Sequence, residues 1–208
     1  AINAYFTRTT VEPIVSTRGN CDLLIARHVM EHVEHLQDFT KAIGDLLSPT
    51  GYVLIEVPNF EFDLSVGDYS GVWEQHVNYF NLENLSLLLS GIGIRVLHSE
   101  TVTFSGQAMY LIGQRETGQP IPQSLEYVGK LRSKAQAYRD RWPTFKNEFV
   151  QYLHNSQKNG DKVALYGAGH RSCALINFVG LSEYIEFIVD DSIARQGKYM
   201  PGSGLPIL

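Results

Sequence analysis

The chain of 208 residues has few cysteines, no run of basic residues and no long hydrophobic segment. Its two cysteines, Cys21 and Cys173, are far apart and lie among apolar residues, which favours reduced thiols and a cytoplasmic protein. Lys and Arg number 17 against 22 Asp and Glu, which argues against a nucleic-acid or anionic-membrane surface. No apolar stretch approaches the length of a membrane span, and no charged-then-apolar leader is present. Composition thus favours a globular protein with neither a membrane nor a nucleic-acid partner, and it leaves the oligomeric state open.

Two short apolar runs predict buried strands in the first half of the chain. They cover residues 21–26 and 52–57, and turn residues flank each run. Pro58 ends the second run, because proline has no N–H for a sheet ladder. Apolar residues at helical spacing over 36–47 predict a helix between the two strands. Strand, helix and strand form a crossover unit, so we expect the two strands to be parallel.

A polar and aromatic loop follows the second strand, and it holds the residues best suited to acid–base chemistry. Trp73, Glu74, Gln75 and His76 come together in the sequence, with Tyr79 close behind. Loops at strand ends are where open α/β sheets place their ligands. A carboxylate, an amide, an imidazole and a phenol in such a loop predict proton transfer. The alternative is an ordinary surface loop anchored by a buried tryptophan.

After this loop the sequence predicts one helix and a hairpin. Asn81 is a good N-cap for a leucine-rich helix that ends at Gly91-Ile92-Gly93. Residues 94–103 and 108–114 then read as two strands joined around residues 105–107. We expect this hairpin to complete the parallel sheet.

The segment that follows the first strand contains the pattern H-x-x-E-H, formed by His28, Glu31 and His32. In a helix this spacing places both histidines on one face, as in one class of zinc peptidase. Here the pattern begins at a strand end, so His28 is not expected to be helical. We therefore predict no metal site, with His28 facing a ligand crevice and His32 packing or capping locally.

Residues 21–115 resemble the second half of a class I S-adenosylmethionine-dependent methyltransferase. The resemblance lies in three stretches, ARHVMEHVEHLQDF, LLSPTGYVLIEVPNF and HVNYFNLENLSLLLSGIGI. The most similar subgroup contains C-methyltransferases that act on nucleotide-linked deoxysugars and carry a Tyr-His-Glu-His-like stretch before a Tyr-Phe pair. This chain has Trp73, Glu74 and Gln75 at the first three of those positions, and it keeps His76 and Tyr79-Phe80.

The resemblance implies methyl transfer from S-adenosylmethionine to carbon, on a small molecule such as a nucleotide-linked keto-sugar. It implies that His76 is the base, with Glu74 as its partner and Tyr79 orienting the substrate. Arg27 and His28 would border the cofactor. Two features of the subgroup, the glycine-rich cofactor turn and an N-terminal cysteine-rich zinc module, are not found in this sequence. We therefore expect a fragment of a longer enzyme, inactive by itself.

A second unit is predicted after a boundary at residues 116–122, which contain two prolines and a glycine. A mostly polar helical stretch covers about 124–156, and Pro143 should kink or divide it. Residues 162–166 form a strand that leads into Gly167-Ala168-Gly169, a helix covers 173–179, and a further strand covers 185–189. These elements form another βαβ unit.

The turn at Gly167 is a near fit to the dinucleotide fingerprint, with Gly169 in place and Asp190 about twenty residues further on. Ser172 stands at the third glycine position. A glycine turn at a helix N-terminus suits a pyrophosphate, because free N–H groups and the helix dipole point there. The alternative is a tight turn without a ligand.

The same C-methyltransferase subgroup has a similar C-terminal domain, which helps to hold the nucleotide-sugar. Its pattern is approximated by Tyr166-Gly167-Ala168, Val189-Asp190 and the stretch 196–202. The residues that the resemblance implies for substrate binding are Asn59, Trp73, Tyr166, Gly167, Gly169, His170 and Asp190.

The sequence thus predicts an α/β protein with two partial Rossmann-like, doubly wound units joined by a helical linker. The expected domains are residues 1–116, the half methyltransferase domain; 117–160, the helical linker; and 161–208, the nucleotide-binding unit. The alternatives to a methyltransferase are a non-catalytic nucleotide-binding module and an NAD-dependent oxidoreductase that uses the Gly167–Asp190 unit.

Overall fold

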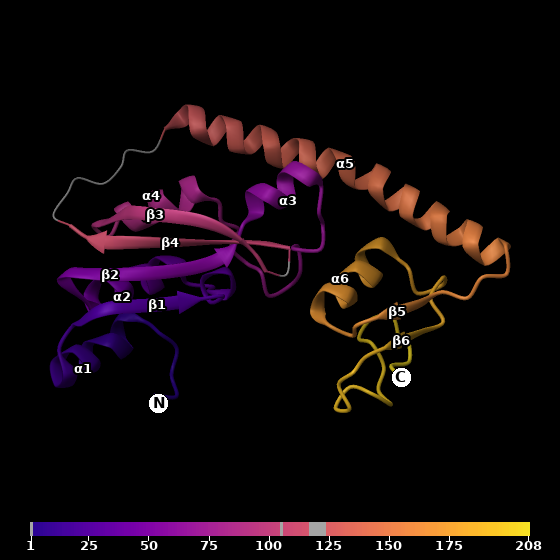
Figure 1. Cartoon of the computed structure of the whole chain (residues 1–208), viewed down its shortest axis with the longest axis horizontal. Helices are drawn as coiled ribbons and strands as arrows, with labels where there is room; N and C mark the ends of the chain where they lie inside the picture. Colours follow the sequence, from indigo (N-terminus) through magenta and orange to yellow (C-terminus); the bar gives the residue numbers. More distant parts are fainter. Residues whose placement is uncertain (1, 105, 117–123) are drawn as a thin grey trace. The chain divides into compact units, whose positions relative to one another are not determined.

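A computed structural model describes residues 2–104, 106–116 and 124–208 (Figure 1). The chain divides into two compact units. Unit 1 is built from residues 1–62 and 75–129, and unit 2 from residues 63–74 and 130–208. The segment 63–74 therefore belongs with the C-terminal half of the chain, although it lies inside the sequence of the N-terminal half. Most of the boundary predicted at 116–122 lies outside the described residues.

Unit 1 contains a mixed sheet in the order β1-β2-β4-β3. Its strands are β1 (Cys21–Arg27), β2 (Leu47–Pro58), β3 (Ile94–Thr103) and β4 (Gln107–Arg115). β1 and β2 are parallel, with Ala26 opposite Ile55 and Arg27 opposite Glu56. β4 is antiparallel to both β2 and β3. The predicted crossover and hairpin are confirmed, and the carboxyl ends of β1 and β2 meet at one edge.

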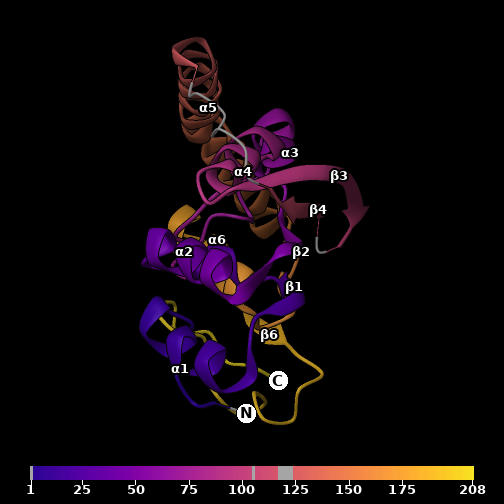
Figure 2. The ribbon, with the colours of Figure 1, turned by 90° about the vertical axis from the view of Figure 1, so that its left-hand side faces the viewer.

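Three helices accompany this sheet: α1 (Arg8–Arg18), α2 (Leu36–Leu46) and α4 (Leu82–Ser90). Asn81 begins α4, because its side chain accepts a hydrogen bond from the N–H of Asn84 and the Asn84 side chain bonds back to the N–H of Asn81. Ile43 of α2 and Leu85 of α4 belong to the same core cluster as Val53 and Ile55. Both helices lie on one side of the sheet (Figure 2). The predicted N-cap is confirmed.

The opposite face of the sheet is largely open in the described residues. Leu23 and Ile25 of β1 are 56% and 59% exposed, and Tyr52 of β2 is 42% exposed. The sequence predicted a buried strand at residues 21–26, and for this face the prediction is wrong. Alternate side chains of a strand point to opposite faces, and here helices cover one face.

Two short helices lie where the sequence predicted none. They are the 3₁₀ helix η1 (Met30–His32) and the helix α3 (Phe60–Val66). The sequence predicted a kink or a division at Pro143. The long helix α5 (Leu125–Lys158) continues through this proline, so the helix is not divided there.

Unit 2 combines most of α5 with β5 (Ala164–Tyr166), α6 (His170–Val179) and β6 (Phe187–Val189). β5 and β6 are parallel. Their core contains Leu153 of α5, Ile176 of α6 and Ile188 of β6. The α/β class is confirmed in both units. In the part of the chain that the structure describes, no helix has the length and apolar character needed to cross a membrane.

Candidate functional site

The carboxyl ends of β1 and β2 bring a cation and a buried carboxylate together. Nε of Arg27 donates to Oε2 of Glu56 at 2.5 Å, and Nη2 donates to Oε1 at 3.3 Å. Glu56 is 6% exposed. The hydrogen bond from Arg27 is the main reason that the pKa of Glu56 lies below its usual range. The register of the parallel strands produces this pair, because Arg27 and Glu56 are directly opposite each other.

His28 is held between two carboxylates just beyond β1. Its Nε2 lies 3.1 Å from Oε1 of Glu56, and its Nδ1 lies 3.3 Å from Oε1 of Glu31. Its backbone has a φ of 50°, an uncommon value for a residue other than glycine. This turn ends the strand and separates His28 from the 3₁₀ helix that carries Glu31 and His32. The prediction that the H-x-x-E-H pattern is not one continuous helix is therefore confirmed.

Glu31, His32 and His76 form a cluster at the same edge. One side-chain donor atom from each residue lies within 4.8 Å of the others. Glu31 is 2% and His76 8% exposed, and the His32 and His76 rings are 5.0 Å apart at a steep angle. Oε2 of Glu31 is buried and has no hydrogen-bond partner among the described residues. The cluster thus combines the imidazole of His76, which the sequence analysis predicted as a site residue, with the carboxylate of Glu31, which it did not predict.

Backbone hydrogen bonds fasten the loop that carries His76 to the 3₁₀ helix. The N–H groups of Val77 and Asn78 both donate to the carbonyl oxygen of Glu31, at 2.9 and 3.1 Å. The Asn78 side chain donates to the carbonyl oxygens of Met30 and Val33. His76 therefore has a fixed position beside Glu31, as a group that handles protons requires.

Tyr79 and Asn59 lie near this loop in unit 1 and have protein partners of their own. The Tyr79 ring packs on Phe60, with centroids 4.4 Å apart. Burial raises the pKa of the Tyr79 hydroxyl, so this group stays a proton donor near neutral pH. Nδ2 of Asn59 donates to Oε1 of Gln107 at 2.7 Å.

Glu74 and Trp73 belong to unit 2, whereas Gln75 and His76 belong to unit 1. Within unit 2 the Trp73 indole stacks on the His170 ring, with centroids 5.0 Å apart and planes within 17°. Glu74 is exposed. Within unit 1 a carboxylate oxygen of Glu31 lies beside His76. The sequence analysis had named Glu74, and not Glu31, as the partner of His76.

The glycine turn of unit 2 has the predicted shape. Gly167 has a φ of 99°, and Gly169 is the N-cap of α6. A Cβ added at either glycine would meet no atom within 4 Å. Tyr166 is 72% exposed, and its hydroxyl is hydrogen-bonded to Asp191. The turn therefore leaves room for a ligand to approach its backbone.

Asp190 holds this turn together from the end of β6. Its carboxylate accepts hydrogen bonds from the N–H of Ala168 at 2.6 Å, the N–H of Ser192 at 2.8 Å and Nη1 of Arg195 at 3.0 Å. These donors, Ala168 first, lower the pKa of Asp190. In the dinucleotide fingerprint the corresponding acid binds a ribose. Here its oxygens already have protein partners.

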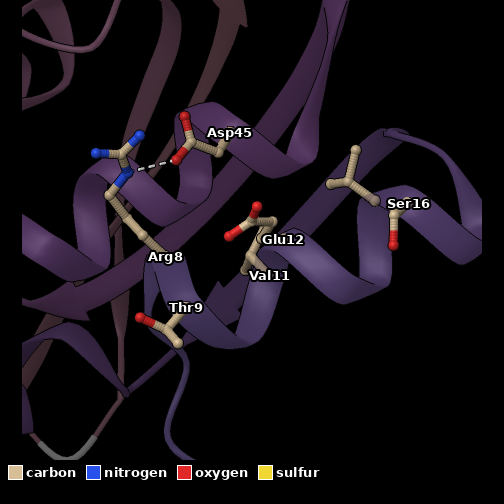
Figure 3. A pocket seen from close by; sticks show the side chains of 7 residues that line it. Arg8, Thr9, Val11, Glu12, Ser16 and Asp45 are labelled. Carbon is tan, nitrogen blue, oxygen red and sulfur yellow. Dashed lines mark hydrogen bonds and ion pairs between the residues drawn. The ribbon is translucent and has the colours of Figure 1, made fainter.

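A pocket between α1 and α2 holds none of the predicted site residues (Figure 3). Arg8 and Asp45 form an ion pair of 2.6 Å at its side. Asp45 precedes the start of β2, whereas the site described above lies where β2 ends. The two places are at opposite ends of the strand.

The structure thus gathers the predicted residues into two groups. Unit 1 holds Arg27, His28, Asn59, His76 and Tyr79, and unit 2 holds Trp73, Glu74, Tyr166, Gly167, Gly169, His170 and Asp190. Sequence reasoning missed Glu56, which reads as part of an apolar run, and the pairing of Glu31 with His76. The H-x-x-E-H pattern was the signal for Glu31 and His32.

Two family models match the chain. Residues 4–99 match a methyltransferase domain, and residues 126–208 match a C-methyltransferase C-terminal domain. The two halves of the chain are thus similar, in order, to a methyltransferase domain and to the C-terminal domain of C-methyltransferases. The resemblance stated from the sequence is confirmed in both halves, and so is the choice of S-adenosylmethionine as the cofactor of the family.

The curated relative C-methyltransferase NovU of Streptomyces niveus is 26% identical over 216 residues. The match covers 99% of this chain and 51% of the relative, so the chain spans about half the length of the curated relative that it matches. The magnesium protoporphyrin IX methyltransferase of Synechocystis PCC 6803 with bound SAH is 13% identical, with a TM-score of 0.39 over 47% of this chain and 46% of that chain. An O-methyltransferase family protein of Burkholderia thailandensis is 15% identical, with a TM-score of 0.40 over 55% of this chain and 34% of that chain. The assignment depends on the sequence matches, because these structural likenesses are distant.

Proposed function

We propose that the chain forms part of an enzyme that transfers a methyl group from S-adenosylmethionine to a carbon atom next to a carbonyl group. One observation carries the proposal: His76 is buried beside Glu31 at the carboxyl ends of two parallel strands, in a chain related to C-methyltransferases. When bound, S-adenosylmethionine supplies an electrophilic methyl group on a positively charged sulfur. The residues of the chain have to generate the carbon nucleophile.

His76 acts as the general base in this proposal. An imidazole is suited to proton transfer near neutral pH. It takes the proton from the carbon next to the carbonyl, and the resulting enolate supplies the electron pair for the new carbon–carbon bond. The methyl–sulfur bond would break at the same time, and its electron pair would remain on the sulfur of the cofactor. We assign to Glu31, in place of Glu74, the role of stabilising the imidazolium formed. The support is that a carboxylate oxygen of Glu31 and a ring nitrogen of His76 lie within 4.8 Å of each other. Tyr79, whose hydroxyl keeps its proton, orients the carbonyl oxygen.

Arg27 and His28 are the residues proposed to border the cofactor. The guanidinium of Arg27 has five N–H donors, more than its contacts with Glu56 use, and the side chain is 60% exposed. It fits the carboxylate of the methionine part of the cofactor. His28 fits less well as a direct contact, because both ring nitrogens face carboxylates. We propose that it fixes Glu31 and Glu56 in place.

The substrate proposed is a nucleotide-linked keto-sugar held by unit 2. The stacked pair of Trp73 and His170, the open turn at Gly167 and Gly169, and the exposed Tyr166 support this proposal. Nucleotides combine a flat base with phosphates, and a glycine turn at a helix N-terminus suits the phosphates. The partners of Asp190 argue against an NAD-dependent oxidoreductase, because the ribose of NAD needs that carboxylate.

Ligand-induced changes in melting temperature test the nucleotide. A ligand stabilises the folded state in proportion to its affinity, so thymidine or uridine diphosphate should raise the melting temperature more than NAD does. His170→Ala should remove that rise, whereas His154→Ala, on α5, should keep it. A larger rise with NAD would favour the oxidoreductase, and no rise with any of them would favour a turn without a ligand.

Replacement of the base tests the reaction, in a protein that contains this chain and binds S-adenosylmethionine. We expect His76→Ala to slow methyl transfer by about 10²–10⁴-fold, the usual contribution of a general base, with little change in cofactor affinity. Glu74→Gln should have a smaller effect. Near-normal turnover in His76→Ala, together with loss of turnover in Glu74→Gln, would move the base to Glu74.

A further inference from the structure

We propose that Glu31, His32 and His76 form a binding site for a divalent transition-metal ion such as Zn²⁺. This inference goes beyond the methyl transfer proposed above and departs from the expectation of no metal. One donor atom from each of the three residues lies within 4.8 Å of the other two. Ligand atoms about 2.1 Å from an ion are roughly 3.4 Å apart, so small side-chain rotations bring these three into range. Two imidazoles and a carboxylate are ligands that Zn²⁺ and other divalent first-row transition-metal ions bind.

The buried carboxylate of Glu31 supplies a second, independent reason. The residue is 2% exposed, and its Oε2 has no hydrogen-bond partner among the described residues. Leaving a buried carboxylate oxygen without a partner is costly. Oε1 is already 3.3 Å from Nδ1 of His28 and 3.9 Å from Nε2 of His32. A cation bound beside Glu31 would give the second oxygen the partner that it lacks.

The partners of His32 supply a third reason. Its Nδ1 lies 2.8 Å from the carbonyl oxygen of Gln75, and only a protonated nitrogen can bond to a carbonyl. In the neutral ring this leaves the lone pair on Nε2, the nitrogen that faces Glu31. A metal-bound histidine usually donates its other N–H to a carbonyl or carboxylate in this way. His28 acts as a further outer partner, because it joins Glu31 to Glu56.

The site is already shaped before an ion arrives. The loop that carries His76 is fastened to η1 by hydrogen bonds from Val77 and Asn78 to the Glu31 carbonyl oxygen. The ligands come from two segments 44 residues apart, and these bonds fix their separation. Three protein ligands leave at least one coordination position for water or a substrate oxygen. The arrangement is that of an open site.

Co²⁺ titration of the untagged 208-residue chain, freed of metal by a chelator, tests the site. We expect one equivalent of Co²⁺ to bind and give visible d–d absorption, and one equivalent of Zn²⁺ to displace it. Glu31→Gln, His32→Asn and His76→Asn should each weaken binding by more than the about 10–100-fold that the loss of an outer partner costs. His98→Asn is the matched control, because His98 also lies near a glutamate, Glu100, but is exposed on β3.

The proposal fails if no Co²⁺ binds, if binding survives in all three variants, or if His98→Asn weakens it equally. Circular dichroism shows whether each variant folds. If a variant does not fold, a measurement on the unchanged chain still tests the site. In NMR spectra, Zn²⁺ should shift the ring signals of His32 and His76 and leave the ring signals of His98 and His154 unchanged. Shifts confined to His98 or His154 would also overturn the proposal.

The outcomes for metal binding and for methyl transfer are separate. Absence of metal binding leaves His76 available as a base, and loss of turnover in His76→Ala does not require a metal. Both roles use the imidazole of His76, which cannot hold a metal ion and accept a proton through the same nitrogen. In an active longer protein, added Zn²⁺ should therefore slow methyl transfer, and a chelator should restore it.

Discussion

Among single residues, Asp63 of α3 destabilises the folded state when its carboxyl group is ionised. It is 9% exposed, and burial, with the charge of Asp68, raises its pKa to about 6, while Arg171 opposes the shift. An unfolded aspartate has a pKa of about 3.9. Between these values the carboxyl group of Asp63 binds more protons in the folded unit than in the unfolded chain. The contribution of Asp63 to stability is therefore greatest below about pH 4 and is lost as the pH rises through 6.

We therefore predict that Asp63→Asn removes part of the loss of stability between pH 4 and pH 7. Above pH 7 the variant should be more stable than the unchanged chain by about 1–2 kcal/mol, a discounted value for a shift of this size. Urea unfolding followed by tryptophan fluorescence measures it, because Trp73 and Trp142 both belong to unit 2. Asp161→Asn, at an exposed position, is the control. Parallel stability curves for Asp63→Asn and the unchanged chain would disprove the assignment.

Asp190 is expected to behave in the opposite way. Its lowered pKa means that it stabilises unit 2 above the pKa of an unfolded aspartate, and that this stabilisation is lost as the pH falls. Asp190→Asn should lower the melting temperature of unit 2, because the charge that holds the N–H of Ala168 is removed. Asp191→Asn, which changes the exposed neighbour, should have little effect. If Asp190→Asn instead abolished NAD binding with no change in melting temperature, the residue would be a ribose ligand.

At the scale of elements, a glycine decides how closely β4 packs against its neighbours. A Cβ added at Gly113 would lie 2.6 Å from Cγ2 of Ile94 and 3.3 Å from the carbonyl oxygen of Arg95. We predict that Gly113→Val destabilises unit 1 by about 1–3 kcal/mol through overpacking. Amide hydrogen exchange in β2 and β4 measures the loss. The control is Gly129→Ala in α5, where an added Cβ meets nothing within 4 Å. Unchanged protection in Gly113→Val would show that the sheet adjusts.

The sequence predicted elements well where local chemistry decides them. Asn81 at the start of α4, the hairpin of β3 and β4, and the end of β2 near Pro58 follow from capping, alternation and the missing proline N–H. It failed at α3, where aromatic and polar residues without clear periodicity fold into a short helix. Of the kink or division predicted at Pro143, the division does not occur, because a long helix can lose one backbone hydrogen bond without ending.

The candidate site was predictable only in part, for a related reason. His76 stood out because its residue type suits proton transfer. Its neighbour Glu31 comes from a segment 45 residues earlier in the sequence. Their proximity depends on backbone hydrogen bonds between the two segments, which a local sequence pattern does not predict. Glu56 was hidden in an apolar strand, and its role appears only with the parallel register that places it opposite Arg27.

At the scale of the whole molecule, each unit has its own core, and one face of the unit 1 sheet is open. The face that carries Leu23, Ile25 and Tyr52 exposes apolar side chains in the described residues. The sequence predicted a partial doubly wound unit, whereas a complete one covers both faces of its sheet. The chain matches about half the length of the curated relative.

The residues at the end of β1 lead to a prediction about the cofactor. We expect the 208-residue chain by itself to show no saturable micromolar binding of S-adenosylmethionine in isothermal titration. Cofactor binding in the family uses a glycine-rich turn after a strand, where the backbone can approach the ligand closely. The first strand of the unit 1 sheet, β1, instead ends at Arg27 and is followed by His28, and the side chains of both residues contact Glu56. We expect these two residues to contact one side of the ligand. Contact on one side buries too little of the ligand's surface for tight binding. Saturable micromolar binding that Arg27→Ala abolishes would contradict this expectation, and it would place the principal cofactor contacts at the β1 end.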